Sequence, residues 1–178
     1  ALRNHVPKAD NSLVARLRAA GAIVTAKTNV PDMGAGANTR NPVWGATGNP
    51  FDPSLNAGGS SGGSAAALAT GMLPLCTGSD TGGSLRIPAA LCGVVGLRPS
   101  PGLIANRSRP LGWSAISVLG PMARDVADTA MMLAAFVLVK LLTLSPGVEI
   151  GLLVLAASAG APLLPRKLLR IGDGAYIF

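Results

Sequence analysis

The stretch GGSSGGSAAALATGMLPLCTGSDTGGSLRIPAALCGVVGLRPS, residues 58–100, is the most informative part of this chain. Two Gly-Gly-Ser clusters, Gly58–Ser61 and Gly82–Ser84, flank an Ala-rich run and a short apolar run. Glycine loses the most backbone entropy on folding, so such clusters mark sharp turns or close approaches of the backbone. Serine hydroxyls beside free backbone N–H groups are what a nucleophile and an oxyanion hole require. The stretch therefore points to chemistry carried by serines.

The sequence around this stretch alternates between helical and extended patterns. The first expected element is a helix that Asn11 or Ser12 caps, that runs through Ala20 and that stops at Gly21. The others are a buried strand at Ala22–Ala26, an irregular Gly- and Pro-rich segment at Asp32–Ala57, a helix at Ser64–Thr70 that ends at Gly71, and a strand at Leu73–Thr77. Alternating helices and buried strands predict an α/β fold, with a mixed β-sheet sandwiched by helices.

Length and charge limit the classes of function. A chain of 178 residues suits one domain or a piece of a larger one, and the net charge of +7 invites a nucleic-acid interpretation. Aromatic residues are only 3% of the chain, however, and its basic residues form no continuous stripe. Without stacking platforms or a basic stripe, direct binding of nucleic acid is not expected.

The two cysteines, Cys76 and Cys92, both lie in apolar runs and do not form a C-x-x-C motif. With a single histidine in the chain, we expect no metal site, and nothing predicts another cofactor. Buried free thiols favour a reducing compartment, so we expect a cytoplasmic protein. The N-terminal residues ALRNHVPKAD lack the apolar region of a signal peptide.

Five segments, in order, resemble the amidase signature family of serine amide hydrolases. They are RLRAAGAIVTAKTNVPDM, WGATGNPFDP, GGSSGGSAAA, GSDTGGSLRIPAALCGVVGLRPS and LGPMARDVADTAMML. The resemblance runs from about Ala9 to Ala135 and implies the mixed sheet and helices of that fold in incomplete form. We therefore expect residues 1–135 to be a partial amidase signature domain.

Residues 136–178 depart from the family and are more apolar. Ile150–Pro165 carries no charge but is shorter than the ~20 apolar residues of a membrane span, and Pro146 and Pro162 interrupt the region. Membrane association is not expected for residues 1–135 and stays open for residues 136–178. The segment is either a divergent set of core elements or the product of a frameshifted, fused or truncated reading frame, and we place no function in it.

The resemblance implies hydrolysis of non-peptide carboxylic amides of small molecules by a Ser–cis-Ser–Lys triad through an acyl-enzyme. Ser84 matches the nucleophile, and Ser60 matches the serine that relays its proton beside a cis peptide bond. The backbone N–H groups of Thr81, Gly82, Gly83 and Ser84 would bind the oxyanion. The Gly-rich run also has the composition of a nest of successive N–H donors.

Three residues are expected to support this site. Ser61 would hydrogen-bond within its loop, Asp80 would accept N–H bonds in the nest, and Arg86 would orient the loop. The simpler alternatives are that Ser60 and Ser61 only cap the following helix and that Arg86 is a surface charge. Large apolar side chains that could line a substrate pocket, or belong to the core, are those of Met33, Trp44 and Trp113.

The family's triad lysine stands in a Lys-Asp context upstream of the first Gly-Ser loop. Lys8 is followed by Ala9-Asp10, and Lys27 matches a Lys-Thr-Asn loop that does not hold the triad lysine. We therefore interpret the chain as an N-terminally truncated fragment that lacks the base and has little activity alone.

Other interpretations carry less weight. The G-x-S-x-G pattern around Ser61 follows no strand, and the chain's one histidine, His5, precedes it. Asp80-Thr81-Gly82 fits the aspartic-protease motif, but that motif directly follows a hydrophobic strand, and here Thr77-Gly78-Ser79 intervenes. The glycines also suggest a phosphate-binding loop, but no G-K-[ST] motif follows them. Two alternatives stay open: a protein like the family's glutamyl-tRNA amidotransferase A subunit, acting with partners, or a non-catalytic fragment or pseudo-enzyme. A homodimer is also compatible with the sequence.

Overall fold

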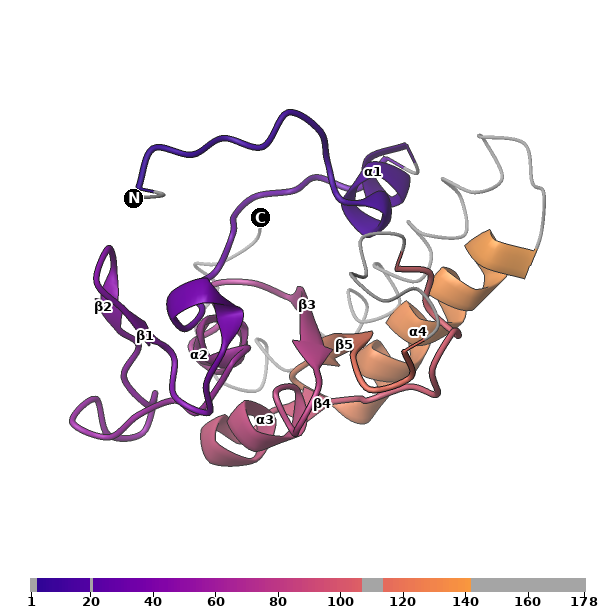
Figure 1. The fold of residues 1–178 in the computed structure, drawn as a ribbon. Helices are drawn as coiled ribbons and strands as arrows, with labels where there is room; N and C mark the ends of the chain where they lie inside the picture. Colours follow the sequence, from indigo (N-terminus) through magenta and orange to yellow (C-terminus); the bar gives the residue numbers. More distant parts are fainter. Residues whose placement is uncertain (1–2, 20, 107–113, 142–178) are drawn as a thin grey trace, which may run out of the picture.

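The structure, a computed structural model, describes residues 3–19, 21–106 and 114–141 (Figure 1). Its elements are α1 (Ser12–Ala19), the 3-10 helix η1 (Asp32–Gly34), β1 (Arg40–Asn41), β2 (Gly45–Ala46), α2 (Gly62–Ala69), β3 (Leu75–Asp80), α3 (Arg86–Cys92), β4 (Val95–Gly96), β5 (Val118–Ala123) and α4 (Val126–Leu141). The expected α/β class is confirmed.

The central sheet has three antiparallel strands in the order β3-β5-β4. Side chains alternate between its faces, as in any strand. Cys76 belongs to the buried cluster beneath α2 and α3, whereas its neighbour Leu75 packs against the cluster formed with α1 and α4. Helices therefore cover both faces of the sheet, as the sequence predicted (Figure 1). In the part of the chain that the structure describes, the strand pairings are antiparallel, and β1 and β2 form a separate small hairpin.

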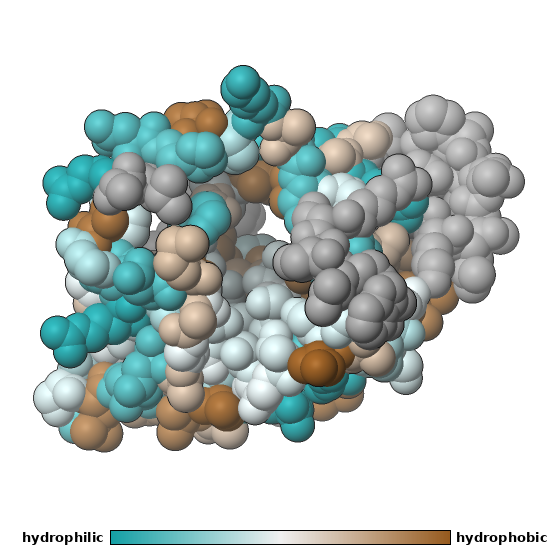
Figure 2. All heavy atoms as spheres, in the orientation of Figure 1, coloured by the Kyte–Doolittle hydropathy of each residue, from teal (hydrophilic) through white to brown (hydrophobic). Residues whose placement is uncertain are grey.

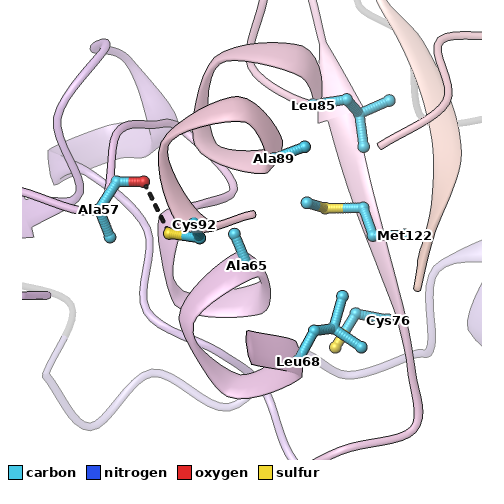
Figure 3. Packing of buried hydrophobic residues seen from close by; sticks show 8 residues of the cluster. All are labelled: Ala57, Ala65, Leu68, Cys76, Leu85, Ala89, Cys92 and Met122. Atoms are coloured by element: carbon cyan, nitrogen blue, oxygen red, sulfur yellow. Dashed lines mark hydrogen bonds between the residues drawn. The ribbon is translucent and has the colours of Figure 1, made fainter. Parts of the chain in front are cut away.

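The first core lies between the sheet and the helices α2 and α3. Its members are buried and mostly small: Ala57, Ala65, Leu68, Cys76, Leu85, Ala89, Cys92 and Met122 (Figure 3). Alanines on the facing helices let the two backbones approach closely. The Cys92 thiol donates a hydrogen bond to the Ala57 carbonyl at 3.5 Å, which ties α3 to the segment before the first Gly-Ser loop.

A pair of glycines in the sheet creates the space for Leu85. Gly78 in β3 lies opposite Gly120 in β5. A Cβ added at Gly78 or at Gly120 would lie 2.6 Å from a methyl carbon of Leu85, which is fully buried. Because Gly78 and Gly120 carry no side chains, the side chain of Leu85 fits against both strands. Leu85, the residue directly after Ser84, is therefore anchored on the sheet.

The second core joins α1, α4 and the opposite face of the sheet. Its buried members are Leu13, Ile104, Met132 and Phe136. The start of α1 is capped as expected, because the Asn11 side-chain oxygen accepts the Leu13 N–H at 2.9 Å.

Three local predictions need correction. Ala22–Ala26 is not a strand: its residues are exposed, Ile23 by 88%, and no neighbouring strand in the described ranges pairs with it. An apolar run alone cannot form a strand without such a partner. Helix α2 begins at Gly62 rather than Ser64, and β3 occupies Leu75–Asp80 rather than Leu73–Thr77.

Helix α4 runs through residue 136, where the sequence suggested a change of origin. That division stays a prediction, because residues 142–178 lie outside the described part of the chain. Within the described ranges, no helix combines the length and the hydropathy that crossing a membrane requires.

We predict that Leu85→Ala lowers the free energy of unfolding by about 2–5 kcal/mol, because it leaves a cavity between Gly78 and Gly120. The measurement is urea unfolding followed by circular dichroism. The matched control is Leu55→Ala, whose side chain is 59% exposed and should change stability by less than about 0.5 kcal/mol. Equal effects of the two substitutions would contradict the anchoring role of Leu85.

Candidate functional site

The structure brings the two Gly-Ser loops into direct contact. The Ser61 N–H donates a hydrogen bond to the Ser84 carbonyl at 3.2 Å. Ser60 and Ser61 are both buried, and Ser84 is half-buried. The peptide bond between Gly59 and Ser60 is cis, as expected for one of the two bonds flanking Ser60. The pair of serines predicted to react therefore come from adjoining loops.

The sequence led us to expect that the Ser61 hydroxyl would hydrogen-bond within its own loop, and this prediction is wrong. Its hydroxyl donates to the Ser79 carbonyl at 3.4 Å and accepts the Ser79 N–H at 3.3 Å. Ser79 lies in β3, so Ser61 fastens the first loop to the central strand. Ser61 stands at the cap position of α2 but makes no side-chain cap hydrogen bond, which removes helix capping as the explanation for this hydroxyl.

The first loop fits between backbone segments that leave no room for side chains. A Cβ at Gly63 would lie 2.4 Å from the Asn29 backbone nitrogen, and one at Gly62 would lie 2.3 Å from the Thr39 hydroxyl oxygen. The double glycine therefore allows α2 to start against residues 29 and 39. This close approach explains why the helix begins earlier than its alanines suggested.

Asp80 organises the second loop. Its carboxylate is fully buried at the end of β3 and accepts the Gly83 N–H at 2.8 Å and the Leu85 N–H at 3.1 Å. Arg86 binds both carboxylate oxygens, at 3.0 and 3.1 Å, in a two-pronged ion pair. Charge-assisted bonds of this kind satisfy a carboxylate that would otherwise be very costly to bury. The Arg86 side chain is 56% exposed and is held by Asp80, and its role in orienting the loop stays a prediction.

Arg98 completes the surroundings of Asp80. One guanidinium nitrogen donates to the Asp80 carboxylate at 3.1 Å and also to the Asp80 carbonyl, and another donates to the Ile116 carbonyl at 2.9 Å. We predicted no role for this residue from the sequence. The sequence does show a cationic side chain between Leu97 and Pro99 in a mostly apolar segment, which indicates a buried ionic partner for Arg98. It does not indicate that this partner is Asp80.

Burial by itself raises the pKa of the Asp80 carboxyl, because the charged form loses water. The hydrogen bonds from Arg86, Leu85 and Gly83 and the positive charge of Arg86 outweigh this effect and hold the pKa well below its usual range. Asp80 is therefore a permanent anion at neutral pH that fixes backbone N–H groups, and it is not placed to exchange protons.

The hydrogen bond from the Gly83 N–H to Asp80 contradicts the oxyanion-binding role that we expected for Gly83. The Gly83 N–H points to the carboxylate, so in this conformation it does not face a substrate oxyanion. Gly83 has φ +129°, a backbone conformation that favours glycine, and it lies against the Ile87 side chain. Thr81 and Gly82 are exposed, and a Cβ at Gly82 would meet no atom within 4 Å. Space beside the nest is therefore open at Gly82.

Several side chains singled out from the sequence lie in solvent. Met33 and Trp44 are 81% and 74% exposed, so neither is a core residue, and Trp113 lies outside the described residues. Lys8 and Lys27 are also exposed. Seen in the orientation of Figure 1, the surface of the molecule has a hollow near its middle (Figure 2).

The two cysteines are buried free thiols, as the sequence predicted. Burial raises the pKa of Cys76 to about 11, against an opposing hydrogen bond with Ser64, and burial also raises the pKa of Cys92. Both side chains are therefore uncharged at neutral pH and act as packing residues of the first core.

A family model described as Amidase matches residues 1–138. The A subunit of glutamyl-tRNA(Gln) amidotransferase from Thermus thermophilus is 49% identical over 134 residues, covering 75% of this chain and 28% of the relative. Its counterpart from Alkaliphilus metalliredigens is 47% identical over 132 residues, covering 74% and 27%.

Solved structures agree with these matches. The 6-aminohexanoate cyclic dimer hydrolase has a TM-score of 0.68 at 40% identity, covering 75% of this chain and 28% of its own. The glutamyl-tRNA(Gln) amidotransferase A subunit from Thermotoga maritima has a TM-score of 0.66 at 38% identity, covering 74% and 29%. This chain therefore spans less than a third of the length of each of these relatives.

We predict that acid weakens the fold through Asp80. An unfolded aspartate has a pKa of about 3.9, and the folded value is lower, so the stabilisation is fully present above about pH 4. It decreases as the pH falls from about 4 towards the folded pKa, because the unfolded chain then binds the proton first. Urea unfolding between about pH 5 and pH 2.5 measures this slope.

Asp80→Asn should flatten that slope, and it should also destabilise the protein because two arginines lose their partner. The control variant Leu55→Ala changes an exposed side chain that carries no titratable group, so it should keep the slope of the unaltered chain. An Asp80→Asn protein with an unchanged slope would contradict the depressed pKa.

Proposed function

The chain belongs to the amidase family, and on that basis we propose that its two serine loops hydrolyse carboxylic amides through an acyl-enzyme on Ser84. The observation that carries the proposal is the hydrogen bond from the Ser61 N–H to the Ser84 carbonyl, which joins the two loops. The anchored Leu85 and the buried Asp80 hold the Ser84 backbone from the other side. A positioned nucleophile beside a second buried serine suits covalent catalysis.

In the proposed reaction, the Ser84 hydroxyl oxygen attacks the amide carbonyl carbon while its proton passes through the Ser60 hydroxyl towards a base. The oxyanion forms beside the N–H groups of Thr81, Gly82 and Ser84, where the open space at Gly82 admits the substrate oxygen. The base returns this proton to the amide nitrogen as the C–N bond breaks, and the neutral amine leaves. Water then hydrolyses the ester on Ser84, which releases the carboxylic acid and restores the serine hydroxyl. Gly83 contributes indirectly, by holding the nest onto Asp80.

We place the base of this reaction on a lysine in a Lys-Asp context that residues 1–178 do not include. A lysine that accepts a proton near neutral pH is typically buried, since burial disfavours its charged form. Lys8 and Lys27 are both exposed, so neither side chain has such surroundings.

A second candidate is the catalytic component of an amidotransferase. The curated relatives at 45–49% identity are named as the A subunit of glutamyl-tRNA(Gln) amidotransferase, whereas the 6-aminohexanoate cyclic dimer hydrolase shares 40%. In this version the same serines would release ammonia from an amide donor, and the protein would act with partner proteins. Co-purification of further components with the protein would favour this candidate over an amidase acting alone.

We predict that a fluorophosphonate probe labels Ser84. Labelling should be fast in a lysine-complete version, in which a segment carrying the Lys-Asp pair that the family resemblance implies is added before Ala1, and slow in the chain of 178 residues. Intact mass and peptide mapping identify the labelled residue. Ser84→Ala should abolish labelling, and the control Ser54→Ala, in an exposed turn, should not change it. Labelling that survives Ser84→Ala would exclude Ser84 as the nucleophile.

We also predict that the chain of 178 residues turns over a simple aryl amide far more slowly than about 1 s⁻¹, a typical enzyme rate. General acid–base catalysis contributes roughly 10²–10⁴-fold, which a chain without its base lacks. Release of the arylamine followed by absorbance is the measurement. A rate of about 1 s⁻¹ or more would contradict the placement of the base outside residues 1–178, and Lys8→Met and Lys27→Met would then test each lysine as the substitute base.

A further inference from the structure

Thr39 is a buried polar residue for which we predicted no role from the sequence. It precedes β1, between the 3-10 helix and the small hairpin, and only 2% of its surface is exposed. Buried hydroxyls are almost always hydrogen-bonded, and the identity of their partners indicates what they hold in place. The hydrogen-bond partners of Thr39 lie in the first Gly-Ser loop, at the start of α2 and directly after the hairpin strand β2.

The Thr39 hydroxyl binds the loop at Ser60 and again two residues later, at Gly62. It donates a hydrogen bond to the Ser60 carbonyl at 3.3 Å and accepts the Gly62 N–H at 3.0 Å. A hydroxyl can donate and accept at the same time, so both bonds coexist. The Thr39 side chain therefore caps the start of α2 from outside the helix, in place of Ser61, which makes no such bond.

The backbone of Thr39 extends the same contact. Its N–H donates to the Gly58 carbonyl at 2.9 Å, so one residue is bonded to positions 58, 60 and 62 in turn. Its own carbonyl accepts the Thr47 N–H at 2.9 Å, and the Thr47 hydroxyl accepts a bond from the Asn29 side chain at 3.0 Å. Thr39 is therefore held by the hairpin while it holds the loop.

We propose that Thr39 is a positioning residue for the amide-hydrolysing site: its hydroxyl holds the Ser60 carbonyl and the Gly62 N–H, its backbone N–H holds the Gly58 carbonyl, and the Ser60 hydroxyl therefore stays in line to relay a proton from Ser84. This inference rests on the proposed function, since it assumes that relay. Thr39 does not touch the reacting atoms. A small displacement of a catalytic group from its productive geometry costs a large part of its effect, which gives a distant hydroxyl its influence on rate.

Two substitutions separate the hydroxyl from the shape of the side chain. Thr39→Val keeps the volume and removes both side-chain hydrogen bonds, whereas Thr39→Ser keeps the hydroxyl. In the lysine-complete version, we expect Thr39→Val to slow fluorophosphonate labelling of Ser84 by about tenfold, and Thr39→Ser to restore most of the rate. If the hydroxyl acts through Ser60, Thr39→Val should slow labelling no further in a Ser60→Ala background.

A second measurement does not depend on reactivity. Amide hydrogen exchange in the chain of 178 residues should accelerate at Gly62 in Thr39→Val and return to normal in Thr39→Ser. Exchange at Leu85, which is bonded to Asp80, should stay unchanged in both variants and serves as the control for general loosening.

The outcomes separate the two claims. Unchanged exchange at Gly62, or equal acceleration at Gly62 and Leu85, would overturn the positioning role of Thr39. Additive effects of Thr39→Val and Ser60→Ala on labelling would also overturn it, because Thr39 would then act by another route. Failure of the unaltered lysine-complete version to label Ser84 would overturn the proposed function, while exchange at Gly62 still decides whether Thr39 holds this loop.

Discussion

The candidate site depends on one buried negative charge. Asp80 ends the central strand, and its carboxylate is bound by two backbone N–H groups and two arginines. A buried carboxylate without such partners would be strongly destabilising, so these groups are forced to converge on it. That convergence turns the chain sharply after β3 and sets Ser84 directly before the buried Leu85. The position of the candidate nucleophile is thus fixed by electrostatics on one side and by packing on the other.

Close approach of backbones is the second constraint. Gly62 and Gly63 allow the first loop to press against Thr39 and Asn29, and the pair Gly78 and Gly120 admits the Leu85 side chain into the sheet. The glycines of the two Gly-Ser clusters and of the sheet therefore have different structural roles. Some provide contact between loops, others provide a cavity for a neighbour, and Gly82 leaves open space.

Four features could be predicted from the sequence: the α/β class, helices on both faces of the sheet, the Asn11 cap of α1 and the cis peptide bond beside Ser60. It misplaced elements whose boundaries depend on distant partners. The apolar run at Ala22–Ala26 has strand propensity, yet a strand needs a neighbour to pair with. The start of α2 depends on Thr39, and the environment of Asp80 depends on Arg98. Neither partner can be identified from local sequence, because hydrogen bonds between segments far apart leave no periodic signal.

The order of strands in the sheet has a consequence for how the site assembles. β5 lies between β3 and β4, although both of these strands precede it in the chain. The two outer strands therefore have no ladder of their own until residues 118–123 enter between them. Contacts of such long sequence separation form slowly, because the intervening chain must first lose its freedom. The slot for Leu85 closes only with Gly120 in place, so we expect the serine loops to reach their final geometry late in folding, after the local helices have formed.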